Sequence, residues 1–193
     1  MTHSASGRGG PDDEPLGNWQ HVGDERDEDF GIFRVRSFRA RSPRTGQDRT
    51  FTRIETADWV NVVATTEDDE IVLVRQWRHG REAFTLEIPG GIIDPGEDPA
   101  AAAARELLEE TGYAGEPPEY LGTVDPNPAI LTNRCHTYRI RLARRVADQT
   151  PDPGEDLAVI TMPRADVPAA VAEGRIEHAL VICAFWWDRD EIR

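Results

Sequence analysis

The sequence contains no lysine: its 22 basic residues are all arginine, they stand against 36 acidic residues, and the formal net charge is −14. The absence of lysine excludes a Walker A phosphate loop and a catalytic lysine Schiff base. Serine occurs four times and never in the GxSxG pattern of a serine-hydrolase nucleophile, so we do not expect a serine hydrolase. The large negative charge argues against binding nucleic acid or an anionic membrane through bulk electrostatics.

Long apolar runs and cysteines are also scarce. The longest apolar run, residues 179–187, has nine residues, far short of a membrane span. No charged-then-apolar signal segment opens the chain, so we expect a cytoplasmic protein with no membrane partner. Cys135 and Cys183 lie in apolar stretches and are predicted to be small core residues, although the sequence allows one disulfide between them.

The 193 residues suit one domain with an N-terminal appendage. Residues 1–17 are rich in glycine, proline, serine and acidic residues, and they are predicted to form a disordered acidic tail. Residues 1–29 carry a net charge of −6, whereas residues 30–53 carry a net charge of +6. We expect an N-terminal strand segment over 18–56 and the main domain over 57–193.

Two hairpins are predicted in the first part of the chain. Residues 33–41 alternate apolar residues with arginine at period two, and residues 50–55 resume an extended pattern after a turn signal at 42–46. This hairpin would have a solvated arginine face; alternatively, its arginines meet an anionic ligand or an acidic partner surface. The apolar segments 60–64 and 71–74 flank an acidic turn and predict the second hairpin.

The clearest element is a helix that starts after an N-cap at Asp98, has Pro99 in its first position and ends at Gly112. Further strands are predicted over 84–88, 120–124, 136–142 and 157–162, and further helices over 164–173 and 177–188. Strands dominate and no regular βαβ period occurs, so the predicted fold class is α+β, or mixed α/β.

Acidic residues are concentrated around the clear helix: residues 87–119 hold nine of them and one arginine, a net charge of −8. Glu106 and Glu110 are four residues apart, so their carboxylates lie on one helix face, which Glu109 flanks. Clustered carboxylates repel one another unless a cation lies between them, and Mg²⁺ or Mn²⁺ prefers such oxygen ligands. The glycines at 90–91 can turn a backbone carbonyl toward an ion. The alternative is a solvated acidic face.

The spacing around this helix matches the Nudix box, GX5EX7REUXEEXGU with U a bulky apolar residue, at every defined position. The matching residues are Gly91, Glu97, Arg105, Glu106, Leu107, Glu109, Glu110, Gly112 and Tyr113. The chain therefore resembles the Nudix hydrolases. The resemblance implies a Nudix-type αβα sandwich with a central mixed sheet, and metal-dependent hydrolysis of a nucleoside diphosphate linked to another group.

The same resemblance implies roles for individual residues. The metal ligands for Mg²⁺ or Mn²⁺ would be Gly90 through its carbonyl, Glu106, Glu109 and Glu110. Glu109 would act as a ligand or as the anchor of a metal-bound water. Arg105 would orient the carboxylates through charge-assisted hydrogen bonds, and Glu97 would support the loop and the helix. Bound divalent ions would neutralise the phosphates and activate a water molecule.

Three segments outside the box resemble the ADP-ribose diphosphatase branch of the family: Val74–Arg78, Leu86–Gly91 and the loop around Pro128. The predicted substrate-binding residues are therefore Arg78, Glu87 and Pro128. Arg78 would contact a substrate phosphate or the terminal ribose, and Glu87 would support the metal site. The alternative for Arg78 is a surface arginine, and for Glu87 it is a strand glutamate paired with a neighbouring arginine. The alternative for the loop around Pro128 is an ordinary turn.

The branch often takes its catalytic base from an acidic loop late in the chain, and residues 151–157 resemble that loop. Glu155 is the first candidate for the base, with Asp156 and Asp152 as lesser ones; an acidic surface loop is the alternative. The predicted catalytic residues are thus Arg105, Glu109 and Glu155. His178, where the chain resembles the branch's entry into its last helix, is predicted to be structural.

The leading prediction is hydrolysis of ADP-ribose to AMP and ribose 5-phosphate. The resemblance to this branch also implies a homodimer whose N-terminal strands reach across to the partner. Trp19, Phe30 or Phe33 would be available there to stack on a base; alternatively, these aromatic residues are part of the core. The same chemistry on another nucleotide sugar such as GDP-mannose, on a dinucleotide or on an oxidised nucleotide is the second reading. A sensor that binds ADP-ribose-like ligands without cleaving them is the third, and it is disfavoured because all four box glutamates are present.

Overall fold

The computed structural model describes residues 17–189 and divides the chain into two units, residues 1–54 and residues 55–193. The predicted disordered tail, residues 1–17, lies outside the described residues apart from its last one. In the part of the chain that the structure describes, no helix is long and apolar enough to cross a membrane.

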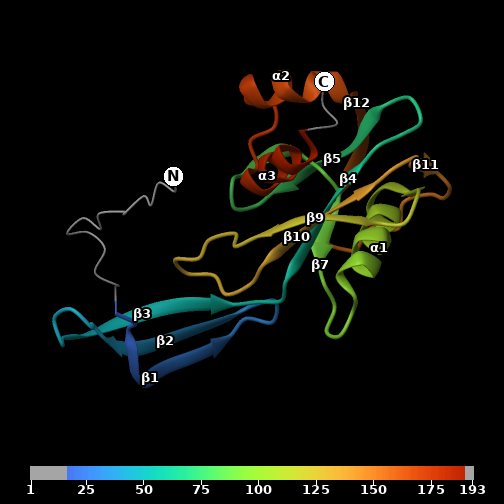
Figure 1. The fold of residues 1–193 in the computed structure, drawn as a ribbon. Coiled ribbons are helices and arrows are strands. Elements are labelled where there is room, and N and C mark those ends of the chain that lie inside the picture. Colours follow the sequence, from blue (N-terminus) through green and yellow to red (C-terminus); the bar gives the residue numbers. More distant parts are fainter. Residues whose placement is uncertain (1–16, 190–193) are drawn as a thin grey trace, which may run out of the picture. The chain divides into compact units, whose positions relative to one another are not determined.

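The first unit is a three-stranded sheet in the order β1 (Gln20–Asp29), β2 (Arg34–Arg41) and β3 (Asp48–Glu55) (Figure 1). Strand β1 lies within the expected strand segment of residues 18–56, but it was not predicted as an individual strand, because its residues show no apolar alternation. It pairs antiparallel with β2, and exposed ion pairs accompany this ladder: Arg34 lies 3.3 Å from Asp27, and Arg39 lies 3.3 Å from Glu25. The acidic surface that these arginines meet is therefore a strand of the same chain.

The second unit carries the remaining elements. Its strands are β4 (Trp59–Ala64), β5 (Glu70–Arg78), β6 (Ala83–Glu87), β7 (Gly90–Ile92), β8 (Tyr113–Ala114), β9 (Glu119–Val124), β10 (Cys135–Ile140), β11 (Arg144–Arg145) and β12 (Leu157–Pro163). Its helices are α1 (Pro99–Thr111), α2 (Val167–Ala172), which follows a short 3-10 turn η1 (Arg164–Asp166), and α3 (Ala179–Asp188).

Two main sheets organise this unit, in the orders β7-β4-β10-β9 and β12-β5-β6. Strands β4 and β10 run parallel, whereas the other pairs in these two sheets are antiparallel, so the first sheet is mixed. The short strands β8 and β11 form a separate antiparallel pair. The predicted mixed α+β class is confirmed.

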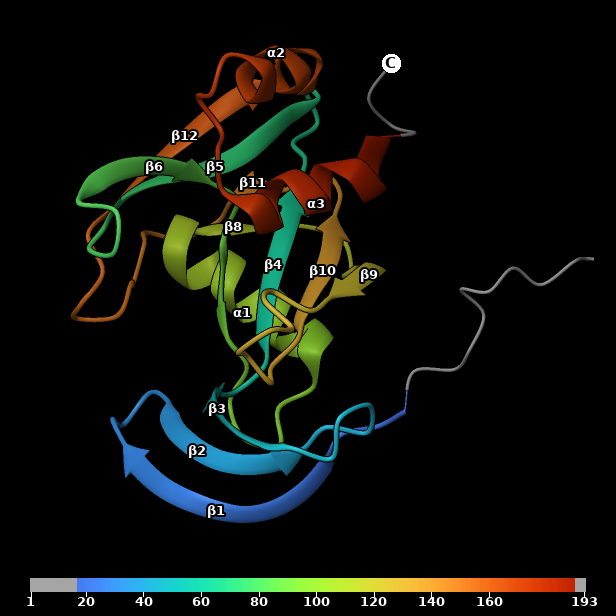
Figure 2. The same cartoon turned by 90° about the vertical axis from the view of Figure 1, so that its left-hand side faces the viewer.

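Helices cover both faces of the sheet that contains β4 (Figures 1 and 2). Val60 and Val62 belong to a buried cluster with Ala103 and Leu107 of α1. The neighbouring Val63 belongs to the other cluster, which includes residues of α2 and α3. Successive side chains of a strand point to opposite faces, so β4 lies between the two helical layers of an αβα arrangement.

The predicted hairpin of residues 60–64 and 71–74 is wrong. Strands β4 and β5 belong to different sheets, and only an isolated bridge between Thr65 and Ile71 joins them. Strand β4 has β7 and β10 as neighbours, and β5 has β12 and β6, so both edges of each strand are already paired. Partner choice of this kind depends on distant segments and is not visible in the local pattern.

Candidate active site

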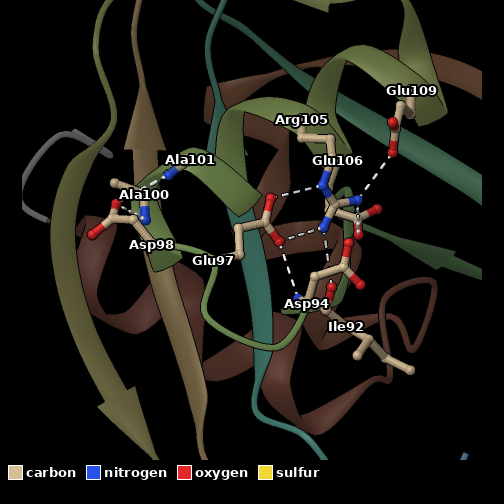
Figure 3. A network of polar contacts seen from close by, with 9 residues as sticks. All are labelled: Ile92, Asp94, Glu97, Asp98, Ala100, Ala101, Arg105, Glu106 and Glu109. Atoms are coloured by element: carbon tan, nitrogen blue, oxygen red, sulfur yellow. Dashed lines mark hydrogen bonds and ion pairs between the residues drawn. The ribbon is translucent and has the colours of Figure 1, made fainter.

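Helix α1, which carries the acidic residues of the predicted site, begins and ends where its local sequence dictates. The side chain of the N-cap Asp98 accepts hydrogen bonds from the backbone N–H groups of Ala100 at 2.9 Å and Ala101 at 3.2 Å, and Pro99 occupies the first position (Figure 3). Gly112 ends the helix with a left-handed φ of 73°, which glycine adopts without strain. These boundaries confirm the predicted helix.

Two glycines before the helix let a site carboxylate and a neighbouring strand approach the backbone closely. A Cβ atom at Gly91 would lie 2.4 Å from Oε1 of Glu106, and one at Gly90 would lie 2.3 Å from the carbonyl oxygen of Val60. A larger residue would therefore displace the carboxylate or strand β4. The backbone N–H of Gly90 also donates a hydrogen bond to Oε2 of Glu110 at 2.9 Å.

Arg105 binds three carboxylates at once (Figure 3). Its Nε and Nη2 atoms each donate to an oxygen of Glu97 at 2.9 Å, while Nη1 donates to Glu106 at 2.8 Å and to Glu109 at 3.0 Å. The hydrogen bonds from Arg105 hold the pKa of Glu97 below its ordinary value. The structure thus brings Arg105 to the carboxylates that it is predicted to orient.

The fold buries two of these acidic side chains. Glu106 is 8% exposed and Glu110 only 2% exposed. Burial raises the pKa of Glu110 to about 8, although the hydrogen bond from Gly90 acts in the opposite direction. Burial also raises the pKa of Glu106. Nearby negative charges, including Glu155, add to both shifts, since like charges favour the protonated form. Nearby positive charge therefore does not offset the burial and mutual repulsion of the Glu106 and Glu110 carboxylates.

The chemistry of this cluster fits a divalent cation. Carboxylate and carbonyl oxygens are the hard ligands that Mg²⁺ and Mn²⁺ prefer. Within residues 17–189, no three acidic, histidine or cysteine side chains are arranged as a finished metal site. Arg105 instead occupies oxygens of Glu106 and Glu109. The ligand set of Gly90, Glu106, Glu109 and Glu110 stays a prediction that the donor chemistry supports.

A second polar cluster lies on the antiparallel pair β5 and β6. Arg78 donates from Nε and Nη2 to the two oxygens of Glu87, both at 2.8 Å, and the Thr85 hydroxyl donates to Oε1 of Glu87 at 2.7 Å. Burial alone would raise the pKa of Glu87, but the hydrogen bonds from Arg78 and Thr85 outweigh it and lower the pKa. Of the alternatives for Glu87, the structure shows the glutamate paired with a neighbouring arginine.

A cavity of about 1050 Å³ brings the two clusters together. The predicted site residues that line it are Arg78, Glu87, Gly90, Arg105, Glu106, Glu109 and Glu155. Asp152 also lines the cavity, whereas Asp156 does not. Glu110 is buried behind the wall and bonded to Gly90. Pro128 is exposed in the loop between β9 and β10, and the structure does not bring it to this cavity.

Among the polar residues of the cavity wall that were not predicted as site residues are Asn61 and His178, the second of which was predicted to be structural. Asn61 of β4 is 7% exposed and donates from its amide nitrogen to the carbonyl of Leu180 at 3.4 Å. His178 precedes the first turn of α3. Among the described residues, Oδ1 of Asn61 and Nδ1 of His178 are buried without a hydrogen-bond partner. The only local signal for Asn61 is a polar residue inside an apolar strand.

Comparison with known proteins agrees with this arrangement. The model of the NUDIX domain matches residues 55–185. An ADP-sugar pyrophosphatase of Mus musculus is 33% identical over 154 residues, which cover 71% of this chain and 71% of the mouse protein. An ADP-ribose pyrophosphatase of Mycobacterium tuberculosis is 31% identical over 157 residues, which cover 78% of this chain and 73% of that protein.

A solved structure shows the same fold. A crystal structure of an ADP compounds hydrolase superposes with a TM-score of 0.81 at 22% identity, over 92% of this chain and 96% of the other. The family match spans most of the second unit, including the loop, α1 and the cavity that they border. The predicted family is confirmed, and the chain belongs to the NUDIX domain family.

Proposed function

We propose that this chain is a metal-dependent hydrolase that cleaves the pyrophosphate bond of ADP-ribose and releases AMP and ribose 5-phosphate. The observation that carries the proposal is one cavity that brings Arg105, Glu106 and Glu109 together with Arg78. The names of two relatives, an ADP-sugar pyrophosphatase and an ADP-ribose pyrophosphatase, support this substrate class.

The box and the residue before it would hold Mg²⁺ or Mn²⁺, through the carboxylates of Glu106, Glu109 and Glu110 and the carbonyl of Gly90. When bound, the ion supplies positive charge to the phosphate oxygens and lowers the pKa of a water molecule. Arg105 orients Glu106 and Glu109, because its Nη1 atom reaches both carboxylates. Glu97 accepts hydrogen bonds from Nε and Nη2 of Arg105, so it fixes the other edge of the guanidinium group and with it the position of Nη1.

Residues on the other side of the cavity would act on the substrate itself. Arg78 would bind a phosphate group, since guanidinium groups suit phosphate oxygens. Glu155 would accept the proton of the attacking water. It lines the cavity, and its charge influences the pKa values of Glu106, Glu110 and Arg78. Asp152 is the second candidate for this base, and the loop that holds Pro128 remains a predicted substrate contact.

The N-terminal unit supports a homodimer. A three-stranded sheet buries little surface by itself. Large apolar residues of this unit are well exposed: Trp19 is 49%, Phe30 is 55% and Ile32 is 71% exposed. A second copy of the chain would cover them, and light scattering after size exclusion tests this by giving the mass of two chains rather than one.

The free thiols of Cys135 and Cys183 suit a reducing cytoplasm, and fractionation of cells tests this localisation.

The test is incubation of the purified protein with Mg²⁺ and ADP-ribose, followed by chromatographic separation of the products. We expect AMP and ribose 5-phosphate from the natural protein and a loss of both with Glu106→Gln. Absence of AMP above this control would refute the proposal. A panel with GDP-mannose, a dinucleotide and an oxidised nucleotide, ranked by kcat/KM, decides the substrate. Tight binding of ADP-ribose without turnover in Mg²⁺ or Mn²⁺ would instead indicate a sensor.

A further inference from the structure

Glu87 is a buried carboxylate at the cavity edge that no step of the proposed reaction uses. Its side chain is 4% exposed, whereas the side chain of its partner Arg78 is 46% exposed. The two hydrogen bonds between them, at 2.8 Å each, make a bidentate pair. One member of the pair is therefore enclosed by protein while the other opens toward the cavity.

The oxygens of Glu87 are already engaged. Oε1 accepts from Nε of Arg78 and from the Thr85 hydroxyl, and Oε2 accepts from Nη2 of Arg78. The ring of His178 lies on the other side, with Nε2 3.9 Å from Oε2. A carboxylate bound and enclosed in this way has little capacity left for direct contact with a substrate or a metal ion.

Arg78 keeps capacity for a ligand. A guanidinium group carries five N–H donors, and Glu87 takes one from Nε and one from Nη2. Both donors of Nη1 and one of Nη2 remain for groups in the cavity. Arg105 shows the same arrangement in use: Glu97 holds its Nε and Nη2 edge, and Nη1 reaches Glu106 and Glu109.

We propose that Glu87 is a positioning residue that, with Thr85, holds Arg78 so that the free edge of its guanidinium group binds a phosphate of the substrate. This inference rests on the proposed function, and the ligand class is the diphosphate of a nucleoside-diphosphate derivative. The physical benefit is that Arg78 is ordered before the substrate arrives, so less side-chain entropy is lost on binding. The low pKa of Glu87 keeps its carboxylate ionised and the pair intact.

A double-mutant cycle tests this role. Glu87→Gln puts an amide N–H against a guanidinium N–H, so we expect KM for ADP-ribose to rise about tenfold while kcat changes less than about threefold. Arg78→Gln should raise KM about 10- to 100-fold. Because Glu87 acts through Arg78, the double variant should be no worse than Arg78→Gln alone. Additive losses, or an unchanged KM in Glu87→Gln, would overturn the inference.

Two further comparisons keep the test decisive. Thr85→Ser retains the hydroxyl and should keep the natural KM, whereas Thr85→Val should raise KM a few-fold; equal KM values would contradict the proposal even if Glu87→Gln failed to fold. Glu173→Gln removes a carboxylate from an exposed pair with Arg175 at 2.8 Å and serves as the matched control with natural kinetics. Thermal melts and near-ultraviolet circular dichroism verify folding of each variant.

Binding measurements separate this inference from the proposed function. If the natural protein hydrolyses no ADP-ribose, the proposed function fails, and the same variants are compared by calorimetry with α,β-methylene ADP-ribose, whose bridge resists hydrolysis. A Kd that rises about tenfold in Glu87→Gln and no further in the double variant would support the role of Glu87. Equal Kd values, or no binding by the natural protein, would overturn it.

Discussion

Replacement of Asp188 by asparagine is expected to destabilise the protein more than any exposed charge substitution. Asp188 is fully buried near the end of α3 and accepts hydrogen bonds at 2.5 Å from Arg139 and from Arg164. The side chains of the two arginines are themselves only 7% and 5% exposed. The substitution preserves the shape of the side chain but removes its negative charge. That charge is the fully buried partner of both Arg139 and Arg164.

The magnitude follows from what the arginines retain. Removing one partner of a buried ion pair costs about 3–5 kcal/mol. Arg139 keeps a contact with Glu119 at 3.3 Å, and Arg164 keeps one with Asp69 at 2.8 Å. We therefore expect the lower end, about 3 kcal/mol of the free energy of unfolding. For a chain of this size that corresponds to a fall in Tm of roughly 6–12 °C.

Urea denaturation and thermal melts measure this loss. Asp148→Asn is the matched control, because Asp148 pairs with Arg145 at 3.1 Å but its side chain is 98% exposed, and exposed pairs contribute about 0–1 kcal/mol. A loss below about 1 kcal/mol in Asp188→Asn, or equal losses in the two variants, would refute the reasoning that this buried network holds α3 against the sheet.

Three further outcomes are expected. Gly91→Ala should lower kcat/KM by about 100-fold, since the new Cβ would lie 2.4 Å from Oε1 of Glu106 and displace it; activity within threefold of natural would contradict this. Cys135 is 1% exposed and burial raises the pKa of its thiol to about 12, so a thiol reagent at pH 8 should leave it unmodified until urea is added. The pKa of Glu87 is lowered in the fold, so its ionised form adds stability above its ordinary pKa of 4.5 that is lost as pH falls through the lower folded value. Glu87→Gln should therefore lose less stability between pH 5 and pH 3, and parallel acid melts of the two proteins would disprove this.

Local signals in the sequence identified the parts of the site that are themselves local. The N-cap Asp98, Pro99 and Gly112 predicted α1 to the residue, and the four-residue spacing of Glu106 and Glu110 placed both acids on one helix. Such features depend on hydrogen bonds and sterics within a few residues. They can be read from the chain without knowing the rest of the fold.

The elements that were missed or misassigned depend on distant partners. Strand β1 is acidic and lacks apolar alternation, and its extended form is stabilised by pairing with the arginines of β2. Strands β4 and β5 each look like half of a hairpin in the sequence. In the structure β4 pairs with β10 and β5 pairs with β12, both of which lie far along the chain. The sequence shows that residues 1–29 and 30–53 carry opposite net charges. In the structure the acidic strand β1 pairs with the arginine-rich strand β2.

Two of the arginines that line the cavity show why residue type alone did not assign roles at this site. Arg78 and Arg105 each give Nε and Nη2 to one glutamate, which leaves Nη1 directed away from that pair. In both cases the glutamate holds the arginine; Nη1 of Arg105 reaches Glu106 and Glu109, and we propose that Nη1 of Arg78 binds a substrate phosphate. A glutamate that binds a ligand and one that holds an arginine look identical in a sequence. In the structure Glu97 and Glu87 each bind two nitrogens of one arginine, whereas Glu106 and Glu109 share the single Nη1 atom of Arg105 and Glu110 accepts a hydrogen bond from the backbone N–H of Gly90.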